Sequence, residues 1–361
     1  MYDSLYDNFL KEILISIINK RHNREIFDYL DNEHIFYIIK NGGLHPFVAY
    51  HVNKINNFKS DIKNSAFIEE GIQKFYGNVK NNFVLNQVLH SLKNVFDKAG
   101  IDFYLLKGKV LSEKYYCHIG CRPIGDIDLF IFPENKDRVR VLLKNMGWQL
   151  YFSDKEKKID HFTFFKGNIT IEFHWEISIF SGVGNNDIFR ITYDILKKHI
   201  EEVEIEGLKY YTFTPEIHFI HSIFNWLKKY GWPPVKILDM YFIYKRVDRV
   251  RLFRIAKKIK VFRMVNFFIN MMKFYFEPDF VALDYICDDF KLIKKFANYR
   301  KNFFLKVLYY FSDSKLDLLY FFYRKVFPRH NFLQNYFYKG SYVQLLYNWY
   351  KEKIIEGTYH K

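Results

Sequence analysis

One stretch near the middle of the chain, residues 122–132, constrains the fold more than any other. It reads RPIGDIDLFIF and places two carboxylates two positions apart in an otherwise apolar run. Because successive side chains of a β-strand point to opposite faces, Asp126 and Asp128 share one face, and Ile127 and Leu129 share the other. The run therefore predicts a strand that buries its apolar face in a core and holds two carboxylates close together on its polar face.

Strand and helix patterns alternate around this run. A helical pattern at 82–98 precedes it, and short apolar segments at 101–108 and 129–132 predict buried strands. Further along, residues 161–166 and 169–177 flank a Gly-Asn pair, which predicts a β-hairpin. The alternation indicates a small domain with both helices and a sheet.

Helical patterns on both sides of this strand-rich part divide the chain into three regions. Residues 1–98 are expected to form an N-terminal helical region, residues 99–205 the strand-containing domain, and residues 206–361 a basic, aromatic-rich helical domain. Within the last region, Thr214 followed by Pro215 is typical of a helix start. The fold class expected is α+β, with a small mixed sheet flanked by helical regions.

The positive charge of the chain is concentrated in its last third. The formal net charge is +15, and residues 241–361 hold 24 of the 55 Lys and Arg against 10 of the 40 Asp and Glu. Residues 245–265 predict a basic amphipathic helix, and later segments mix basic with aromatic side chains. Such a surface suits a polyanion such as tRNA, or peripheral contact with an anionic membrane. A solvated face that binds nothing explains it equally well.

The cysteine content and the N-terminal sequence indicate the compartment. The three cysteines are Cys117, Cys121 and Cys287, too few for a disulfide framework and typical of a reducing compartment. The first residues include acids where a secretory signal would be basic. No uncharged apolar stretch is long enough for a transmembrane helix. We therefore expect a cytoplasmic protein without a transmembrane segment.

A third carboxylate on a later strand extends the polar face around Asp126 and Asp128. In the sequence ITIEFHWEI, at 169–177, Glu172 and His174 share the polar face of the predicted strand. Carboxylates held together repel each other unless a cation lies between them, and their oxygens suit Mg²⁺. Three such groups can hold the metal ions of an in-line displacement at phosphorus. Glu172 is the candidate for ligating a second ion or for accepting the proton of an acceptor.

Groups that suit phosphate lie close to the same run. Lys107 and Gly108 stand where a predicted strand enters a helix, and the N–H groups of a helix N-terminus can cradle phosphate. Arg122 can donate two hydrogen bonds to one phosphate group. Gly125 allows a backbone or a ligand to approach closely.

These residues resemble the nucleotidyltransferase superfamily, which has the polymerase-beta-like fold. Within it they look most like the bacterial family of uncharacterised nucleotidyltransferases. The similarity lies in LKG at 106–108, in RPIGDIDL at 122–129 and in EFHW at 172–175, and it spans roughly residues 35–245. The resemblance implies transfer of a nucleoside monophosphate from an NTP, such as ATP, to a hydroxyl of a protein, a small molecule or RNA, with release of pyrophosphate.

The resemblance also implies roles for residues. Asp126, Asp128 and Glu172 would be the catalytic residues and the ligands of Mg²⁺ (or Mn²⁺). The cofactor-binding residues Lys107, Gly108, Arg122 and Gly125 would contact the NTP.

Four histidines and a distant aspartate match the family more weakly. His161, His174, His218, His221 and Asp239 are expected to line the acceptor side or to support the ligands from behind. The histidines could also suggest zinc, but no cysteine or acid completes such a set at the usual spacing.

Two other functions remain open from sequence alone. One is a catalytically inactive module of the same fold, whose basic helical region holds RNA, an anionic membrane surface or a protein. Three retained acids argue against it, because a module of this kind has no need of clustered carboxylates. The other, a phosphohydrolase, lacks the expected spacing of His and Asp.

Overall fold

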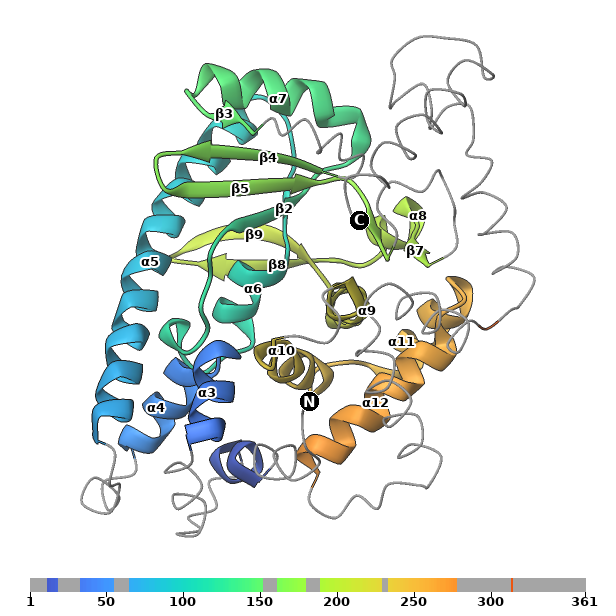
Figure 1. The fold of residues 1–361 in the computed structure, drawn as a ribbon. Helices are drawn as coiled ribbons and strands as arrows, with labels where there is room; N and C mark the ends of the chain where they lie inside the picture. The colour runs from blue at the N-terminus through green and yellow to red at the C-terminus, as the bar shows by residue number, and fades with distance from the viewer. Residues whose placement is uncertain are drawn as a thin grey trace, which may run out of the picture.

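The computed structural model describes residues 12–18, 33–54, 65–151, 161–179, 189–228, 233–277 and Asp313. Within these residues a seven-stranded mixed sheet lies between two groups of helices (Figure 1). The N-terminal group comprises α3 (Glu33–Asn41), α4 (His45–Lys54) and α5 (Ser65–Lys98). The C-terminal group comprises α9 (Pro215–Lys228), α10 (Val235–Tyr244), α11 (Arg249–Lys258) and α12 (Phe262–Phe276). The α+β prediction is confirmed.

The sheet has the strand order β3-β4-β5-β2-β1-β9-β8. Its strands are β1 (Tyr104–Leu105), β2 (Ile127–Phe130), β3 (Gln149–Leu150), β4 (His161–Lys166), β5 (Ile169–His174), β8 (Ile200–Ile205) and β9 (Leu208–Phe213). β2 pairs in parallel with β5 and antiparallel with β1, and β1 pairs in parallel with β9. A separate pair is formed by β6 (Ile177–Ser178) and β7 (Arg190–Ile191).

The predicted hairpin around the Gly-Asn pair is confirmed. β4 and β5 pair antiparallel along their whole length, with Thr163 opposite Glu172 and His161 opposite His174. Gly167 has a φ of 58°, in the left-handed region that a two-residue hairpin turn requires.

The sheet continues beyond residue 205, where we had placed the end of the strand-containing domain. β8 and β9 form a second hairpin across that boundary, and β9 lies inside the sheet between β1 and β8. Its turn is Glu206-Gly207, and both residues have positive φ, 49° and 79°. This pattern is typical of a two-residue hairpin turn, so the sequence did carry a signal for it.

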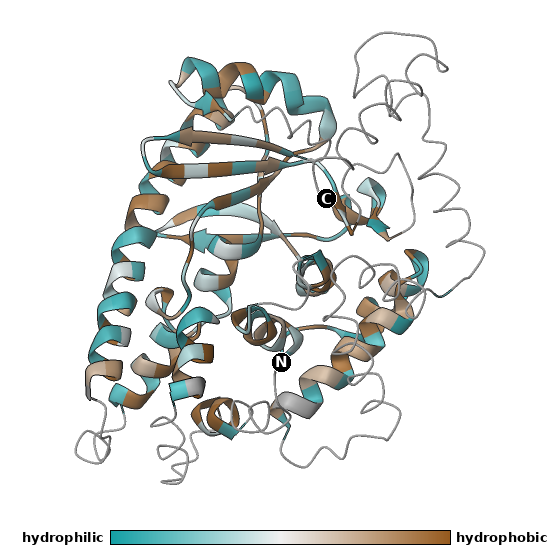
Figure 2. Ribbon diagram, viewed as in Figure 1, coloured by the Kyte–Doolittle hydropathy of each residue, from teal (hydrophilic) through white to brown (hydrophobic). Residues whose placement is uncertain are grey.

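Helix α5 covers the apolar face of the sheet. It ends at Lys98, as the helical pattern at 82–98 predicted, but it begins much earlier. The Phe96 ring stacks on Phe173 of β5 with centroids 5.8 Å apart, and Phe173 points to the face opposite Glu172. Figure 2 shows brown, apolar residues along β2, β4 and β5, and teal residues over much of α5. The carboxylates therefore lie on the sheet face that α5 leaves uncovered.

The shorter helices connect the strands. They are α6 (Lys107–Lys114), η1 (Ile119–Cys121), η2 (Pro133–Asn135), α7 (Lys136–Asn145) and α8 (Tyr193–Lys197). α6 follows β1 directly, which confirms the predicted passage from strand to helix at Lys107 and Gly108.

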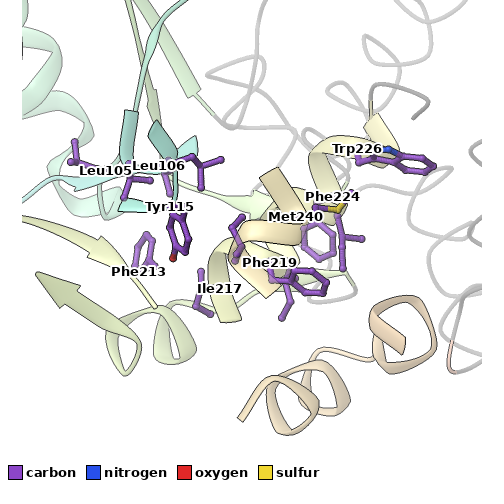
Figure 3. Packing of buried hydrophobic residues seen from close by; sticks show 14 of the residues in the cluster. Leu105, Leu106, Tyr115, Phe213, Ile217, Phe219, Phe224, Trp226 and Met240 are labelled. Atoms are coloured by element: carbon purple, nitrogen blue, oxygen red, sulfur yellow. The ribbon is translucent and has the colours of Figure 1, made fainter. Parts of the chain in front are cut away.

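The core runs from the sheet into the C-terminal helices without interruption. α9 begins at Pro215, as predicted, and its buried side chains pack beside those of β1 and β9. Figure 3 shows side chains from both parts gathered in this region; among them are Leu105, Tyr115, Phe213, Ile217, Phe219 and Met240. This packing fixes α9 against the sheet.

The basic helix predicted over 245–265 is two helices, α11 and α12, separated by Lys260 with a φ of 59°. On α11 the buried face holds Leu252, Ile255 and Ala256. Its exposed face carries Arg249, Arg251, Arg254, Lys257 and Lys258. The basic and aromatic segments after residue 277 and the loop predicted at 181–187 lie outside the described residues. In the part of the chain that the structure describes, no helix is both long and apolar enough to cross a membrane.

Candidate active site

The parallel register of β2 and β5 brings carboxylates from the two strands together. Asp128 lies opposite Glu172, and Phe130 lies opposite His174. The His174 Nε2 atom is 3.0 Å from Asp128 Oδ1 and 3.2 Å from Glu172 Oε2. One donor atom from each of Asp128, Glu172 and His174 lies within 4.8 Å of the other two. Two strands thus supply a compact set of donors that could hold a metal ion.

Lys107 reaches into this set from the turn between β1 and α6. Its Nζ atom donates to Asp128 Oδ1 at 2.6 Å and lies 4.0 Å from Glu172 Oε2. It is also 3.2 Å from His174 Nε2. The backbone of Lys107 has a φ of 40°, a left-handed conformation that a lysine adopts only under constraint from its surroundings.

Asp126 stands one residue before β2, half-buried and outside the compact set of three donors. Its charge nevertheless acts on Lys107: burial lowers the pKa of that ammonium, but Asp128, Glu172 and Asp126 together raise it above the ordinary value. We refer to Lys107, Asp126, Asp128, Glu172 and His174 as the carboxylate cluster.

The two inner carboxylates remain ionised although they are largely buried. Burial alone would raise the pKa of Asp128, but the charge of Lys107 and the hydrogen bond with His174 outweigh it and lower that pKa well below its usual range. The pKa of Glu172 is also lowered, because the hydrogen bond with His174 and the charge of Lys107 outweigh burial and the repulsion from Asp128. The cluster therefore holds three carboxylates against the single ammonium group of Lys107, and His174 Nε2 contacts two of those carboxylates.

One member of the cluster, Glu172, also lines a groove over the β4–β5 hairpin. The groove has a volume of about 430 Å³, and its lining residues are Tyr151, Thr163, Phe165, Gly167, Asn168, Thr170 and Glu172. Asp128 is 3% exposed, whereas the Glu172 side chain is 24% exposed. A ligand in the groove would therefore meet Glu172 first. The sequence analysis did not select Thr163, although its place opposite Glu172 follows from the hairpin register.

The structure gives Arg122 a partner that the sequence did not predict. Its Nε and Nη2 atoms donate to the two carboxylate oxygens of Asp239 on α10, at 2.7 and 2.9 Å. Both side chains are buried, and Tyr116 donates a further hydrogen bond to Asp239 at 2.8 Å. Nη1 is 3.3 Å from the carbonyl oxygen of Pro123. The fork that we assigned to phosphate is thus occupied by Asp239, and contact between Arg122 and the NTP stays a prediction.

The two glycines of the predicted phosphate region have different surroundings. A Cβ on Gly108 would lie 3.2 Å from Arg122 Nη1 and 3.3 Å from a methyl carbon of Ile124, so this glycine allows close packing. A Cβ on Gly125 would meet nothing within 4 Å. The open space at Gly125 is compatible with the approach of a ligand.

Of the remaining histidines, His161 and His221 interact with members of the carboxylate cluster. The rings of His161 and His174 are 5.0 Å apart. His218 and His221, on α9, are buried: burial lowers the pKa of His218 to about 3 and that of His221 well below the ordinary value. His218 Nε2 is 2.8 Å from the Thr212 hydroxyl. Among the described residues, neither group of donors that could hold a metal includes His161, His218 or His221, so no zinc site of these histidines forms there.

A mixed sheet that carries paired carboxylates on parallel strands, beside a Lys-Gly turn, agrees with the class of nucleotidyltransferases that the sequence resembles. The chain matches the profile of the family described as "Uncharacterised nucleotidyltransferase" over residues 28–277, more than half of its length. It belongs to this family and is a nucleotidyltransferase enzyme.

No curated protein matches the chain. Solved structures with a similar fold include the lincosamide antibiotic adenylyltransferase LnuA with lincomycin bound. It shares 12% identity over 44% of this chain and 96% of that chain, with a TM-score of 0.31. ANT(2")-Ia in complex with adenylyl-2"-tobramycin shares 11% identity over 48% of this chain and 95% of that chain, with a TM-score of 0.34. Because these TM-scores are low, nothing about substrate follows from the similarity.

Proposed function

We propose that the protein transfers a nucleoside monophosphate from an NTP to a hydroxyl acceptor at the carboxylate cluster, with release of pyrophosphate. The observation that carries the proposal is the placement of Asp128 opposite Glu172 on neighbouring parallel strands, beside an open groove. Family membership supplies the reaction class, and the geometry supports Asp128 and Glu172 as catalytic residues. Asp126, two positions before Asp128, would act with them.

The cluster suits a divalent cation. Its carboxylates outnumber its one ammonium group, and oxygen atoms dominate the donors. This chemistry fits Mg²⁺ or Mn²⁺, which Asp126, Asp128 and Glu172 would hold, with His174 as a neighbouring donor. When bound, such an ion supplies positive charge that stabilises the phosphoryl group during displacement.

The chain's own groups would position the triphosphate. Lys107 offers an ammonium charge at the mouth of the β1–α6 turn, where the first N–H groups of α6 have no partners within the helix. Gly108 keeps this turn closely packed, and the open space at Gly125 leaves room for the nucleotide. These residues would orient the NTP beside Asp128.

Glu172 is the group best placed to receive the acceptor. Its side chain lines the groove, and its lowered pKa keeps it an ionised carboxylate. An acceptor hydroxyl entering the groove would pass its proton to Glu172 as it attacks the α-phosphorus. The basic face of α11 supports a polyanionic acceptor such as tRNA, with peripheral membrane contact as the competing use of that face.

The test uses labelled NTPs with Mg²⁺ and three acceptor preparations: tRNA, a protein extract and a panel of small hydroxyl compounds. Replacing Asp128 by asparagine keeps its shape and removes its charge. We expect Asp128→Asn to slow transfer about a thousandfold, as expected for loss of a group that stabilises transition-state charge. Asp102→Asn, at an exposed position, serves as the matched control and should keep full activity.

A second measurement covers the case in which none of the acceptors is the right one. Calorimetry should show Mg²⁺-dependent binding of an NTP to the wild-type protein, and the binding should weaken in Asp128→Asn. The proposal is wrong if transfer continues at the wild-type rate in the double variant Asp128→Asn/Glu172→Gln. It is also wrong if the wild-type protein binds tRNA or anionic vesicles but no NTP, which would favour the inactive binding module.

A further inference from the structure

A second group of donor atoms shares no residue with the carboxylate cluster. It consists of His51, near the end of α4, with Cys117 and Cys121, which lie between α6 and Arg122. Cys117 Sγ is 3.8 Å from Cys121 Sγ and 3.5 Å from His51 Nε2. One donor atom from each of the three lies within 4.8 Å of the other two. We call these three residues the thiol cluster.

The spacing of the thiol cluster agrees with the edges of a zinc tetrahedron. With Zn–S bonds of about 2.3 Å and Zn–N bonds of about 2.0 Å, tetrahedral angles place two sulfurs about 3.8 Å apart and a sulfur about 3.5 Å from a nitrogen. The observed Sγ–Sγ and Sγ–Nε2 distances are 3.8 and 3.5 Å. Two of the three ligand pairs, both of which include Cys117, therefore already stand at the separations that a shared zinc ion would impose, and the third pair lies within 4.8 Å.

The surrounding packing holds two of these ligands in place. Cys121 is fully buried, and the His51 ring packs against Phe47 with centroids 4.6 Å apart. Cys117 is exposed, so water can reach the cluster from its side.

We propose that His51, Cys117 and Cys121 bind one zinc ion, with water as the fourth ligand. On binding, both cysteines coordinate as thiolates and release their protons to solvent. The ion would join α4 to the segment that ends at Cys121, and the next residue is Arg122, which pairs with Asp239. Zinc would therefore stabilise the entry into the strand that carries Asp128.

Soft sulfur ligands decide the class of metal. Two thiolates and an imidazole favour zinc or Cu(I) over Mg²⁺, whereas the carboxylate oxygens of Asp128 and Glu172 suit Mg²⁺. The two sites can thus be loaded independently in one protein. A disulfide between Cys117 and Cys121 is the competing chemistry, but both cysteines are free at an Sγ–Sγ distance of 3.8 Å.

The test measures metal content of the full-length protein, purified under reducing conditions and incubated with Zn²⁺. Elemental analysis after gel filtration should show about one zinc per chain. Cys117→Ser and Cys121→Ser should each lose it. Cys287→Ser, which removes the third cysteine of the chain, is the matched control and should keep it.

The absorption spectrum of bound Co²⁺ provides a second measurement, which does not depend on the stability of each variant. Co²⁺ in the wild-type protein should give a sulfur-to-metal charge-transfer band, which weakens in either single cysteine variant and is absent from the double variant. Circular dichroism checks that each variant is folded. Zinc retained by Cys117→Ser/Cys121→Ser would overturn the proposal. The proposal would also be overturned if the reduced, folded wild-type protein binds no zinc. A further contrary result is a disulfide between the two cysteines, found by mass spectrometry, whose reduction restores no metal uptake.

Discussion

Two charged clusters include residues of the segment 122–132, and they differ in their balance of positive and negative charge. Arg122, at its beginning, pairs with Asp239 in a buried arrangement that leaves both side chains 4% exposed or less, and Lys236 Nζ lies 3.7 Å from Asp239 Oδ2. Asp128, six residues later, belongs to the carboxylate cluster, where three acids face one lysine and the Glu172 side chain is 24% exposed. The first cluster is complete within the protein, and the second needs additional positive charge.

This difference shows how a structural ion pair can be told from a binding site within a single motif. A buried pair with matched charges and satisfied hydrogen bonds has nothing left to offer a ligand. A partly exposed group with excess negative charge attracts cations from solution. Residue type alone does not separate the two, because arginine serves both phosphate binding and buried pairing.

Among the substitutions that test this difference between the two clusters, Arg122→Met is expected to have the largest effect. The substitution leaves Asp239 buried without its bidentate partner, and breaking a buried pair from one side costs about 3–5 kcal/mol. Urea unfolding should show this loss in the free energy of unfolding. Arg254→Met, at an exposed position on α11, should change it by less than about 0.5 kcal/mol.

A different result for Arg122→Met would restore the original prediction. If the variant keeps the stability of the wild-type protein but no longer binds NTP, then Arg122 acts on phosphate and its pairing with Asp239 has little structural weight. The sealed cluster would then be part of the active site.

The contrast between Arg122 and Asp128 also shows which features of the fold and the site could be predicted from the sequence. The shared face of Asp126 and Asp128 follows from the two-residue period of a strand, and the hairpin at Gly167 follows from its turn residues. The partner of Arg122 lies 117 positions away on a helix. No local pattern links two such positions, so only the structure reveals the pair.

Local sequence patterns also failed to predict the first half of α5, where packing outweighs the helix propensity of single residues. The first half of α5 contains Gly71 and Gly77, each of which disfavours a helix interior by about 1 kcal/mol. In the structure a Cβ on Gly71 would lie 2.4 Å from Ala49 Cβ on α4, so the glycine is needed for close contact between the two helices. The missed β8–β9 hairpin is different, because its Glu206-Gly207 turn was visible in the sequence but three glutamates in β8 obscured the strand.

A second, smaller effect is expected from the two buried histidines of α9, His218 and His221. Burial lowers the pKa of His218 to about 3, and burial followed by the charge of Lys107 lowers the pKa of His221 well below its ordinary value. Above about pH 6.5 both histidines are neutral in the folded and unfolded states. As the pH falls below that value, the unfolded state binds protons that the folded state does not, so stability is lost.

The loss should amount to about 1.4 kcal/mol per pH unit for each histidine. Urea unfolding between about pH 6.5 and 5 avoids most carboxylate titration, which falls at lower pH. His218→Gln and His221→Gln should each flatten the slope, and His90→Gln is the control. If both test variants keep the wild-type dependence of the unfolding free energy on pH, the histidines of α9 accept protons in the folded state. That result would contradict their burial.

The smallest effect we expect tests directly whether the carboxylate cluster is short of positive charge. Lys107 lies at hydrogen-bond distance from Asp128 and 4.0 Å from Glu172, the place that a divalent cation would compete for. Removing the ammonium in Lys107→Met should therefore tighten Mn²⁺ binding in the absence of nucleotide by about tenfold, since a repelling charge is lost. The same variant should bind NTP more weakly, because Lys107 would contact the triphosphate.

Electron paramagnetic resonance measures free Mn²⁺, calorimetry measures NTP binding, and Lys98→Met at an exposed position should change neither. Weaker Mn²⁺ binding in Lys107→Met would mean that the lysine organises the carboxylates instead of competing for them, and the cluster would then resemble the Arg122–Asp239 pair, complete without an added ion.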